Sequence, residues 1–349
     1  MKILHYSPAF LPKVGGLELN VANIAEHLQR AGHEVTVVTT TPGAEPDRFS
    51  FRVVRCPSAR ELLRWTRWCD VFFQANVSLR GLWPLLLVRR PWVVSHHSWY
   101  CRSDGRIAWQ DRLKRFLLRF AASSIAVSRA VADDLATPSV VIPNPYRDGL
   151  FRRLPDVERT GDLAFVGRLV SDKGADVLLD ALAQLAAEGL RPRLAVVGDG
   201  PEAPHLRAQA AASGVARQVD FLGTRTGEEL VEILNRQRIL VVPSRYDEPF
   251  GIVALEGIAC GCVVVGSAGG GLKDAIGPCG ETFRNGDRAG LARVLGRLLR
   301  HPEIHADYLR HAGEHLARHT AERAAESYLR EIEGAVARAR AGALRRSAA

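Results

Sequence analysis

Residues 244–256, SRYDEPFGIVALE, constrain the fold of this chain more than any other stretch of its sequence. An apolar, β-branched run at 239–243 precedes them and predicts a buried strand. An apolar segment at 252–259 predicts a helix, and the valines at 263–265 predict another buried strand. The pattern is that of a parallel βαβ unit. Its first loop should lie at the carboxyl edge of the sheet, where open α/β proteins bind their ligands.

Two glutamates, Glu248 and Glu256, stand eight positions apart in this unit. Pro249 disfavours helical geometry for the residue before it, so we expect Glu248 in the loop and Glu256 about two turns into the helix. Between them the unpaired N–H groups of the helix start suit a phosphate. They belong to Gly251, Ile252 and Val253. The arrangement suggests two acids that hold hydroxyls on either side of a bound diphosphate. A solvated acidic loop is the alternative.

Two cations follow a second predicted strand, at 163–166, in the sequence Gly-Arg-Leu-x-x-x-Lys-Gly. Arg168 and Lys173 would stand at the carboxyl edge of the same sheet, before a helix predicted from about 176 to 187. A guanidinium and a mobile ammonium together neutralise a diphosphate leaving group. Two solvent-facing cations in a loop are the alternative.

The N-terminal half has the same alternation, with a strand at 2–7, an amphipathic helix at 17–30 and a strand at 34–39. Between the first strand and its helix, Gly15 and Gly16 let backbone N–H groups approach an anion, or form a simple turn.

Another strand predicted at 92–95 ends in two histidines, His96 and His97. Histidine at such a position can contact a sugar hydroxyl or the reacting centre, or it can be structural.

Taken together, these motifs resemble family 4 of the retaining glycosyltransferases, which have the GT-B fold. The carriers of the resemblance are Glu-Pro-Phe-Gly-x-x-x-x-Glu, the small-residue run at 257–266 and the Arg168/Lys173 motif. It covers nearly the whole chain, weakly at 40–90 and strongly at 163–276. It implies an α/β protein with two Rossmann-like, doubly wound domains that face each other across a cleft.

The resemblance also implies roles for individual residues. His97 aligns better than His96 with the histidine that meets the donor sugar in this family. The catalytic candidates are Glu248, His97, Arg168 and Lys173. The donor-binding candidates are Gly15, Gly16, Arg168, Lys173, Leu222, Glu248, Phe250, Gly251, Ile252, Val253 and Glu256. The sequence departs from the family at Pro145 and Tyr146, where Gly-Val is usual after Ile-Pro-Asn, and at Asp274, where glutamate is usual.

The implied activity is transfer of a sugar, of the hexosyltransferase type, from a nucleoside diphosphate to an acceptor hydroxyl with retention. It would serve the synthesis of a glycoconjugate, a cell-surface polysaccharide or a secondary metabolite. UDP- and GDP-sugars are the expected donors, and no metal or cofactor is required. The expected acceptor bears a hydroxyl and is lipid-linked or anionic. A nucleotide-sugar epimerase of the same fold and a noncatalytic basic protein that docks on membranes or polyanions are alternatives.

A nicotinamide enzyme is a further alternative, because Gly198-x-Gly200-x-x-Ala203 follows a strand as a dinucleotide fingerprint does. Pro201 and Pro204 count against it, because each removes an N–H group near the place where a pyrophosphate would bind.

The length of 349 residues suits two domains. We expect an N-terminal, acceptor-side domain at 1–150, a linker at 151–161, a C-terminal, donor-side domain at 162–320 and a helix at 321–345 that crosses back to the first domain. The six cysteines form no ladder, so free, buried thiols are expected.

The net charge of +9 is concentrated in residues 60–120, which carry many arginines and few acids. Four tryptophans are interleaved with them, Trp65, Trp68, Trp83 and Trp92. This mixture suits an anionic membrane surface or a polyanionic acceptor, or is a solvated face. No nucleic-acid motif accompanies the charge. The N-terminus has no signal-peptide pattern, and the apolar stretch 82–88 is too short to span a bilayer. We therefore expect a cytoplasmic protein, peripheral at the inner face of the membrane.

Overall fold

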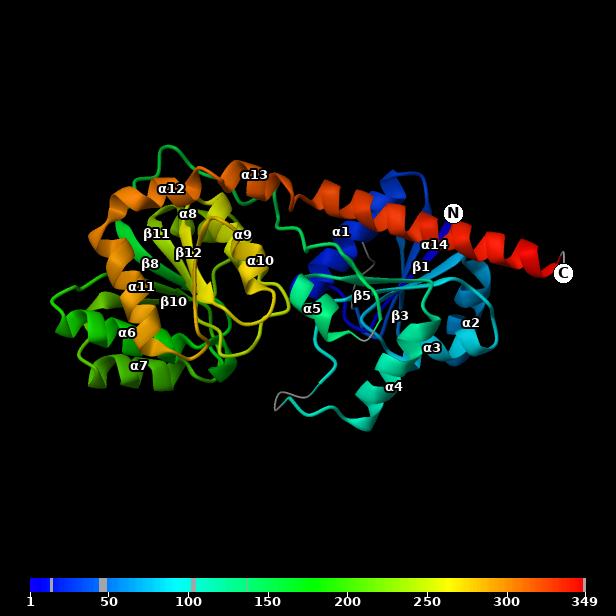
Figure 1. The fold of residues 1–349 in the computed structure, drawn as a ribbon, viewed down its shortest axis with the longest axis horizontal. Helices are drawn as coiled ribbons and strands as arrows, with labels where there is room; N and C mark the ends of the chain where they lie inside the picture. The colour runs from blue at the N-terminus through cyan, green and yellow to red at the C-terminus, as the bar shows by residue number, and fades with distance from the viewer. Residues whose placement is uncertain (13–14, 44–48, 102–104, 136, 348–349) are drawn as a thin grey trace. The chain divides into compact units, whose positions relative to one another are not determined.

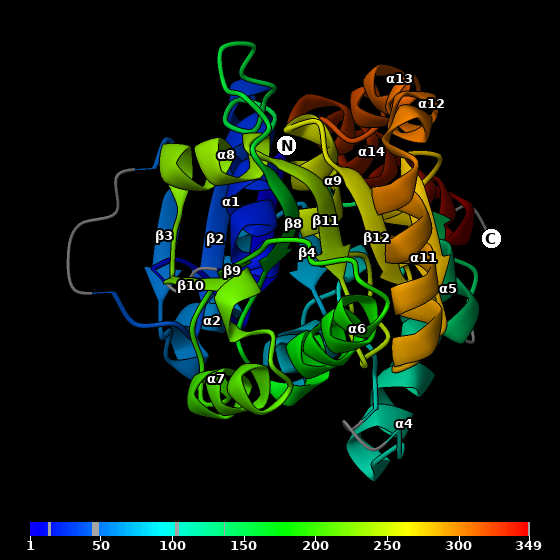
Figure 2. The same cartoon turned by 90° about the vertical axis from the view of Figure 1, so that its left-hand side faces the viewer.

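The computed structural model describes residues 1–12, 15–43, 49–101, 105–135 and 137–347. The chain divides into two compact units (Figures 1 and 2). Unit 1 comprises Met1–Asn144 and Ala321–Ala349, and unit 2 comprises Pro145–Thr320. The division falls ahead of the linker expected at 151–161. Phe151 is already buried in unit 2, and Gly161 begins a strand of its sheet.

In its described part, unit 1 contains a parallel sheet with the strand order β3-β2-β1-β4-β5-β6-β7. The strands are β1 (Lys2–Ser7), β2 (Glu34–Thr39), β3 (Arg52–Arg55), β4 (Val71–Ala75), β5 (Trp92–His96), β6 (Ser123–Ala126) and β7 (Val140–Val141). The helices are α1 (Gly16–Arg30), α2 (Ala59–Trp68), α3 (Leu79–Leu82), η1 (Trp83–Leu86), α4 (Trp109–Leu117), η2 (Leu118–Phe120), α5 (Arg129–Asp134) and α14 (Ala321–Ser347).

One face of this sheet is covered by α1 and by the C-terminal helix α14, which run side by side (Figure 1). Ile24 and Leu28 of α1 and Tyr328 and Ile332 of α14 join one apolar core because each lies on the stripe of its helix that faces the sheet. The Tyr328 ring lies 5.7 Å from the ring of Phe73 on β4. Residues that follow unit 2 in the chain therefore complete the core of unit 1.

In the described residues, unit 2 also has a parallel sheet, with the order β10-β9-β8-β11-β12-β13. The strands are β8 (Gly161–Val166), β9 (Leu194–Val197), β10 (Val219–Gly223), β11 (Gln237–Val242), β12 (Val263–Ser267) and β13 (Gly280–Phe283). The helices are η3 (Ser171–Lys173), α6 (Ala175–Ala187), α7 (Ala203–Ala212), η4 (Ala216–Gln218), α8 (Gly227–Asn235), α9 (Ile252–Ala259), α10 (Leu272–Ile276), α11 (Arg288–Arg300), η5 (Pro302–Ile304), α12 (His305–Leu309) and α13 (Ala312–Ala317).

Both sheets have the strand order of a doubly wound Rossmann fold, 3-2-1-4-5 from the third strand outward. The order reverses between β1 and β4 in unit 1 and between β8 and β11 in unit 2. At such a switch point the two flanking loops leave in opposite directions, so a crevice opens above the carboxyl ends of the strands.

The two ends of unit 2 meet each other. The backbone N–H of Tyr146 donates to the carbonyl of His319 over 3.2 Å, and both side chains are buried. Pro145 and Tyr146, where the sequence departs from the resembled family, are therefore the first two residues of unit 2. Tyr146 is hydrogen-bonded to the end of the same unit.

Some expectations about surface and thiols are wrong. Trp65 and Trp92 are buried and Trp68 and Trp83 are half-buried, because their helices and strands turn them toward the core. The six cysteines, all in the described part of the chain, form no disulfide, but Cys56 is exposed and Cys101 is half-buried. Arg102, one of the arginines of the basic stretch, and Lys13 and Val14 of the first loop lie outside the described residues. In the described part of the chain, no helix is both long and apolar enough to cross a membrane.

Candidate functional site

The switch point of unit 2 carries an ion pair between two predicted site residues. Lys173 ends the loop after β8, Glu248 lies in the loop after β11, and the Lys173 Nζ is 2.6 Å from the Glu248 Oε1. The two loops are joined through backbone, because the carbonyl of Asp172 accepts from the N–H of Arg245 over 2.8 Å. The neighbouring strands β8 and β11 thus bring a cation and a carboxylate together from distant parts of the chain.

The Glu248 carboxylate is fixed from several sides and is 12% exposed. Ser244 donates its hydroxyl to the same oxygen, Oε1, over 2.6 Å. The backbone carbonyl of Glu248 accepts from the N–H of Gly271 over 2.7 Å. Gly270 has φ +68°, and a Cβ there would lie 2.2 Å from the Glu248 carbonyl oxygen. The glycine loop after β12 therefore supports the Glu248 loop at a distance that only glycine allows.

The helix after Glu248, α9, begins at a residue that cannot cap it with a side chain. Gly251 is its N-cap, has φ +104° and supplies no side-chain cap. Gly251, Ile252 and Val253 are half-buried and lie at the positive end of the helix dipole. The helix begins at Ile252 as predicted, and Glu256, its fifth residue, lies little more than one turn into α9, so the expected depth of two turns is wrong.

Glu256 is paired with an arginine from the start of unit 2. Its Oε1 accepts from Nε and Nη2 of Arg147, each over 3.3 Å, and its side chain is 12% exposed. Burial raises the pKa of Glu256 to about 7, and the nearby Arg147 opposes this rise. The carboxylate predicted to hold hydroxyls therefore ionises near neutral pH.

Three other predicted residues of unit 2 have different surroundings. Arg168 is exposed in the loop after β8, at the same edge as Lys173. Phe250 is buried, and its ring lies 5.8 Å from that of His319. Leu222 is within β10, and its side chain lines a hollow with residues of α8. Asp274 lies in the first turn of α10.

In unit 1, the paired glycines cap the first helix. Gly15 is the N-cap of α1 and Gly16 is its first residue. A Cβ on Gly15 would lie 2.5 Å from a carboxylate oxygen of Glu18, so this carboxylate folds back over the helix start. Glu18 is at the third helical position, where a capping glutamate usually stands.

The two histidines after β5 differ in their surroundings. His96 is fully buried, and its ring nitrogens bond the Tyr100 hydroxyl over 2.6 Å and the Ser124 hydroxyl over 2.9 Å. His97 bonds the Ser95 hydroxyl through Nε2 over 2.9 Å, whereas its Nδ1 has no partner among the described residues. Burial lowers the pKa of His97 to about 4, so the ring is neutral at physiological pH.

The backbone of His97 is held by the loop after β4. Its N–H donates to the Asn76 side chain over 2.8 Å. Asn76 has φ +56°, a conformation that residues other than glycine seldom adopt and that is often found at functional sites. Asn76 therefore fixes the start of the loop that carries the candidate histidine.

The glycines of the dinucleotide-like motif, Gly198 and Gly200, pack against backbone of the protein itself. A Cβ on Gly198 would lie 1.9 Å from the Gly167 carbonyl oxygen, and one on Gly200 would lie 2.4 Å from that of Leu169. These glycines allow two loops of unit 2 to pack closely. The space a pyrophosphate would need beside them is filled.

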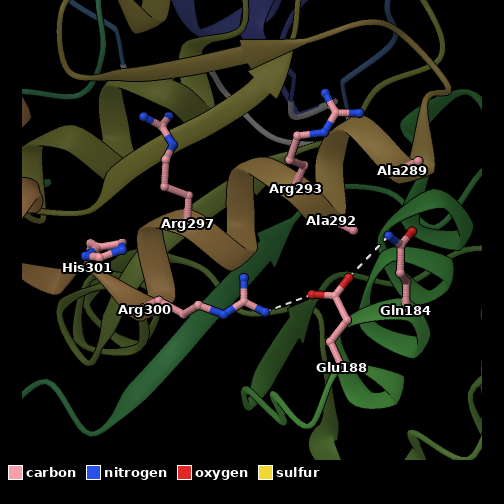
Figure 3. Close-up of a pocket in the computed structure, with 8 residues that line it drawn as sticks. All are labelled: Gln184, Glu188, Ala289, Ala292, Arg293, Arg297, Arg300 and His301. Atoms are coloured by element: carbon pink, nitrogen blue, oxygen red, sulfur yellow. Dashed lines mark hydrogen bonds and ion pairs between the residues drawn. The ribbon is translucent and has the colours of Figure 1, made fainter.

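A hollow of about 450 Å³ lies against α6 and α11, away from these residues (Figure 3). In it Arg300 donates to the Glu188 carboxylate over 2.8 Å, and Gln184 does so over 3.5 Å. None of the predicted site residues lines it. It is a hollow between two packed helices, and its polar groups are partly paired with one another.

Sequence reasoning missed several contacts of the site. Arg147, Ser244, Glu18 and Asn76 all touch predicted site residues or their loops. Ser244 and Glu18 could have been found, because each stands three or four positions from its partner. Nothing in the sequence around Arg147 or Asn76 indicates that Arg147 contacts Glu256 or that Asn76 contacts His97. In the described part of the chain, no three His, Cys, Asp or Glu side chains are grouped so that they could hold a metal ion.

Two family models match the chain. Residues 14–147 match "Glycosyltransferase Family 4", and residues 148–315 match "Glycosyl transferases group 1". A D-inositol 3-phosphate glycosyltransferase of Corynebacterium jeikeium is 37% identical over 398 residues, with 93% of each chain covered. A protein of the same name from Stackebrandtia nassauensis is also 37% identical, over 61% of this chain and 51% of its own length.

Solved structures share the fold. The structure of Anabaena Alr3699/HepE in complex with UDP has a TM-score of 0.82 at 22% identity, with 95% of this chain and 100% of that chain covered. At this identity the likeness concerns the arrangement of the strands and helices.

Proposed function

The chain belongs to glycosyltransferase family 4 and has the GT-B fold, and from this premise we propose that it transfers a sugar from a nucleoside diphosphate to an acceptor hydroxyl with retained anomeric configuration. The observation that carries the proposal is the Lys173–Glu248 pair at the switch point of unit 2, in the loop that leads into the uncapped start of α9. A cation, backbone donors and a carboxylate are what a diphosphate and a sugar require.

In the proposed reaction, the bond between the anomeric carbon and the diphosphate oxygen breaks as the acceptor oxygen bonds to the same face of the sugar. The departing diphosphate oxygen takes the acceptor's proton. Arg168, Lys173 and the N–H groups at the start of α9 stabilise the negative charge that develops on this oxygen, which is usually the largest single contribution to catalysis. To contact the diphosphate, the Lys173 ammonium leaves its ion pair with Glu248 and pairs with a phosphate oxygen instead.

The two glutamates would hold the two ends of the donor. Glu248, released from Lys173, accepts from hydroxyls of the transferred sugar. Glu256 accepts from the ribose hydroxyls, and Arg147 keeps its carboxylate ionised and oriented. In unit 1, the neutral ring of His97 and the backbone of Gly15 and Gly16 would complete the donor site.

The proposed donor is a UDP-sugar, with a GDP-sugar as the second choice. The choice is supported by HepE, whose structure was solved with UDP. Because the cations and helix N–H groups neutralise the diphosphate, we propose that no metal is required. Activity should survive EDTA. Complete loss that manganese restores would contradict this part of the proposal.

The proposed acceptor is a hydroxyl compound that carries a negative charge, either free or lipid-linked. Two relatives are named for D-inositol 3-phosphate, which is such a compound. Inositol phosphates and anionic glycolipids are therefore the first acceptors to test. The anomeric proton coupling of the product, measured by NMR, reports whether configuration is retained.

The decisive experiment combines donor binding with turnover. UDP-sugars should raise the thermal unfolding midpoint of the wild type. Lys173→Ala and Glu248→Ala should each lower kcat/KM by about two to three orders of magnitude. Arg193→Ala is the matched control, because Arg193 forms an exposed pair with Asp220 at the other end of the strands. Wild-type turnover in both site variants would contradict the proposal. Conversion of donor without any acceptor would favour an epimerase.

A further inference from the structure

Helix α4 presents its polar side to the protein. It connects β5 to β6, and such a connecting helix usually buries an apolar stripe against the sheet, yet α4 has no buried residue. Instead, the Lys114 ammonium lies 5.7 Å from the Tyr100 ring centre and is paired with Asp111. Arg115 donates to the carbonyl and the carboxylate of Asp134, each over 2.6 Å. Charged side chains thus attach α4 to unit 1.

The apolar side of α4 and η2 faces outward. Trp109, Leu113, Phe116 and Phe120 recur every three or four residues, so they share one face. Their exposed fractions are 71%, 37%, 50% and 69%, and the rings of Phe116 and Phe120 contact each other edge to face. We call these four side chains, with the 42% exposed Ile107, the α4 stripe. It is a row of large apolar groups that the fold leaves in water.

The charges beside this stripe are positive. Residues 105–120 contain five basic side chains and one acidic side chain, Asp111. Arg112 and Arg119 are exposed and follow one edge of the stripe, and the Arg119 guanidinium lies 5.3 Å from the Phe116 ring centre. Tryptophan and phenylalanine on one face of a helix with arginine beside them are typical of helices that lie in the surface of an anionic bilayer.

We propose that α4 and η2 dock unit 1 on an anionic lipid surface, with the α4 stripe inserted and the arginines at the level of the phosphates. A second copy of the chain fits this surface less well. A twofold contact through the stripe would bring Arg112 and Arg119 of one copy close to the same arginines of the other, where like charges repel. A lipid surface instead supplies negative charge and accepts a row of side chains without a complementary groove.

Co-sedimentation of the full chain with vesicles tests the proposal. The wild type should sediment with vesicles that contain phosphatidylglycerol, much less with phosphatidylcholine alone, and less as salt rises. Trp109→Gln with Phe116→Gln should weaken binding about tenfold or more. The control, Val140→Thr, changes an apolar side chain that is 43% exposed elsewhere in unit 1, and should bind as the wild type does.

A second pair of variants isolates the charges. Arg112→Gln with Arg119→Gln should reduce binding to anionic vesicles, whereas Arg191→Gln with Arg217→Gln, two exposed arginines of unit 2, should reduce it much less. Unchanged thermal unfolding shows that the variants fold. Undiminished binding of the stripe variant would overturn the proposal. So would a dimer in solution, measured by light scattering, that the stripe variant dissociates.

Discussion

Arg147 donates from both Nε and Nη2 to a single carboxylate oxygen of Glu256, each over 3.3 Å. The same guanidinium lies over the Phe151 ring, 4.8 Å from its centre, and this cation–π contact also restricts the position of the Arg147 side chain. This pair joins the first residues of unit 2 to the helix that follows the Glu248 loop. The orientation of the Glu256 carboxylate, which we propose binds the ribose hydroxyls, therefore depends on Arg147.

Replacement of Arg147 by methionine should weaken donor binding more than it slows chemistry. Glu256 would be left buried without its cation, so it would take up a proton and lose its fixed direction. We expect the KM for the donor to rise about tenfold or more, with a smaller change in kcat. Arg152→Met, at the exposed pair with Glu228, is the control. An unchanged donor KM would show that Arg147 does not position Glu256.

The raised pKa of Glu256 predicts a pH dependence of stability. Between its ordinary value of 4.5 and about 7, the folded state binds more protons at this carboxyl than the unfolded state does. Its contribution is therefore complete below 4.5 and is lost as pH rises through about 7. The free energy of unfolding of the wild type minus that of Glu256→Gln should fall over this window by up to about 3 kcal/mol. Urea unfolding at several pH values measures it, and a flat difference would contradict the pKa.

Gly270→Ala should disturb the Glu248 loop. The new Cβ would meet the Glu248 carbonyl oxygen and would also need a positive φ. Gly286→Ala is a matched control, since Gly286 has φ +75° but open space around it. We expect the control to cost about 1 kcal/mol and Gly270→Ala to cost more and to lose most turnover. Equal turnover in the two variants would show that the distance between the loops is unimportant.

The two histidines after β5 should respond differently to substitution. His96→Leu removes two buried hydrogen bonds, so the Tyr100 hydroxyl keeps only the bond from the Val77 N–H and the Ser124 hydroxyl only the bond with Ser139. We expect this loss to cost about 2–4 kcal/mol of stability. His97→Leu should cost less stability, because the His97 ring has one hydrogen bond among the described residues, to Ser95, and should cost more kcat if His97 meets the donor as proposed. Thermal unfolding and steady-state kinetics separate the two effects. The reverse outcome would make His96 the functional residue.

Much of the architecture could be predicted from local sequence. The family and the two Rossmann-like units are confirmed. The β11, α9 and β12 segments fall within a few residues of the predicted ranges, because apolar runs, Pro249 and glycine breakers act locally. The error at Glu256 concerns only its depth in the helix, since α9 begins at Ile252 as predicted and Glu256 is its fifth residue.

Contacts between distant residues could not be predicted in the same way. Arg147 and Glu256 are 109 positions apart, and no spacing rule links them. Trp65 and Trp92 belong to an arginine-rich segment, which suggests an exposed surface, but their side chains are buried in the core. Helix periodicity finds the apolar stripe of α4, yet it does not tell whether the stripe meets a sheet or water. That depends on Tyr100 and Asp134, which hold the opposite side.

The position of α14 in unit 1 has a consequence for synthesis. Tyr328, Ile332 and Ala335 complete the core of unit 1, but the ribosome makes them only after unit 2. While it translates residues 145–320, the nascent first sheet has one face without this cover. Unit 2, whose ends are joined by Tyr146 and His319, is complete before α14 is made. We therefore expect the second unit to reach its native state before the first, against the usual order of co-translational folding.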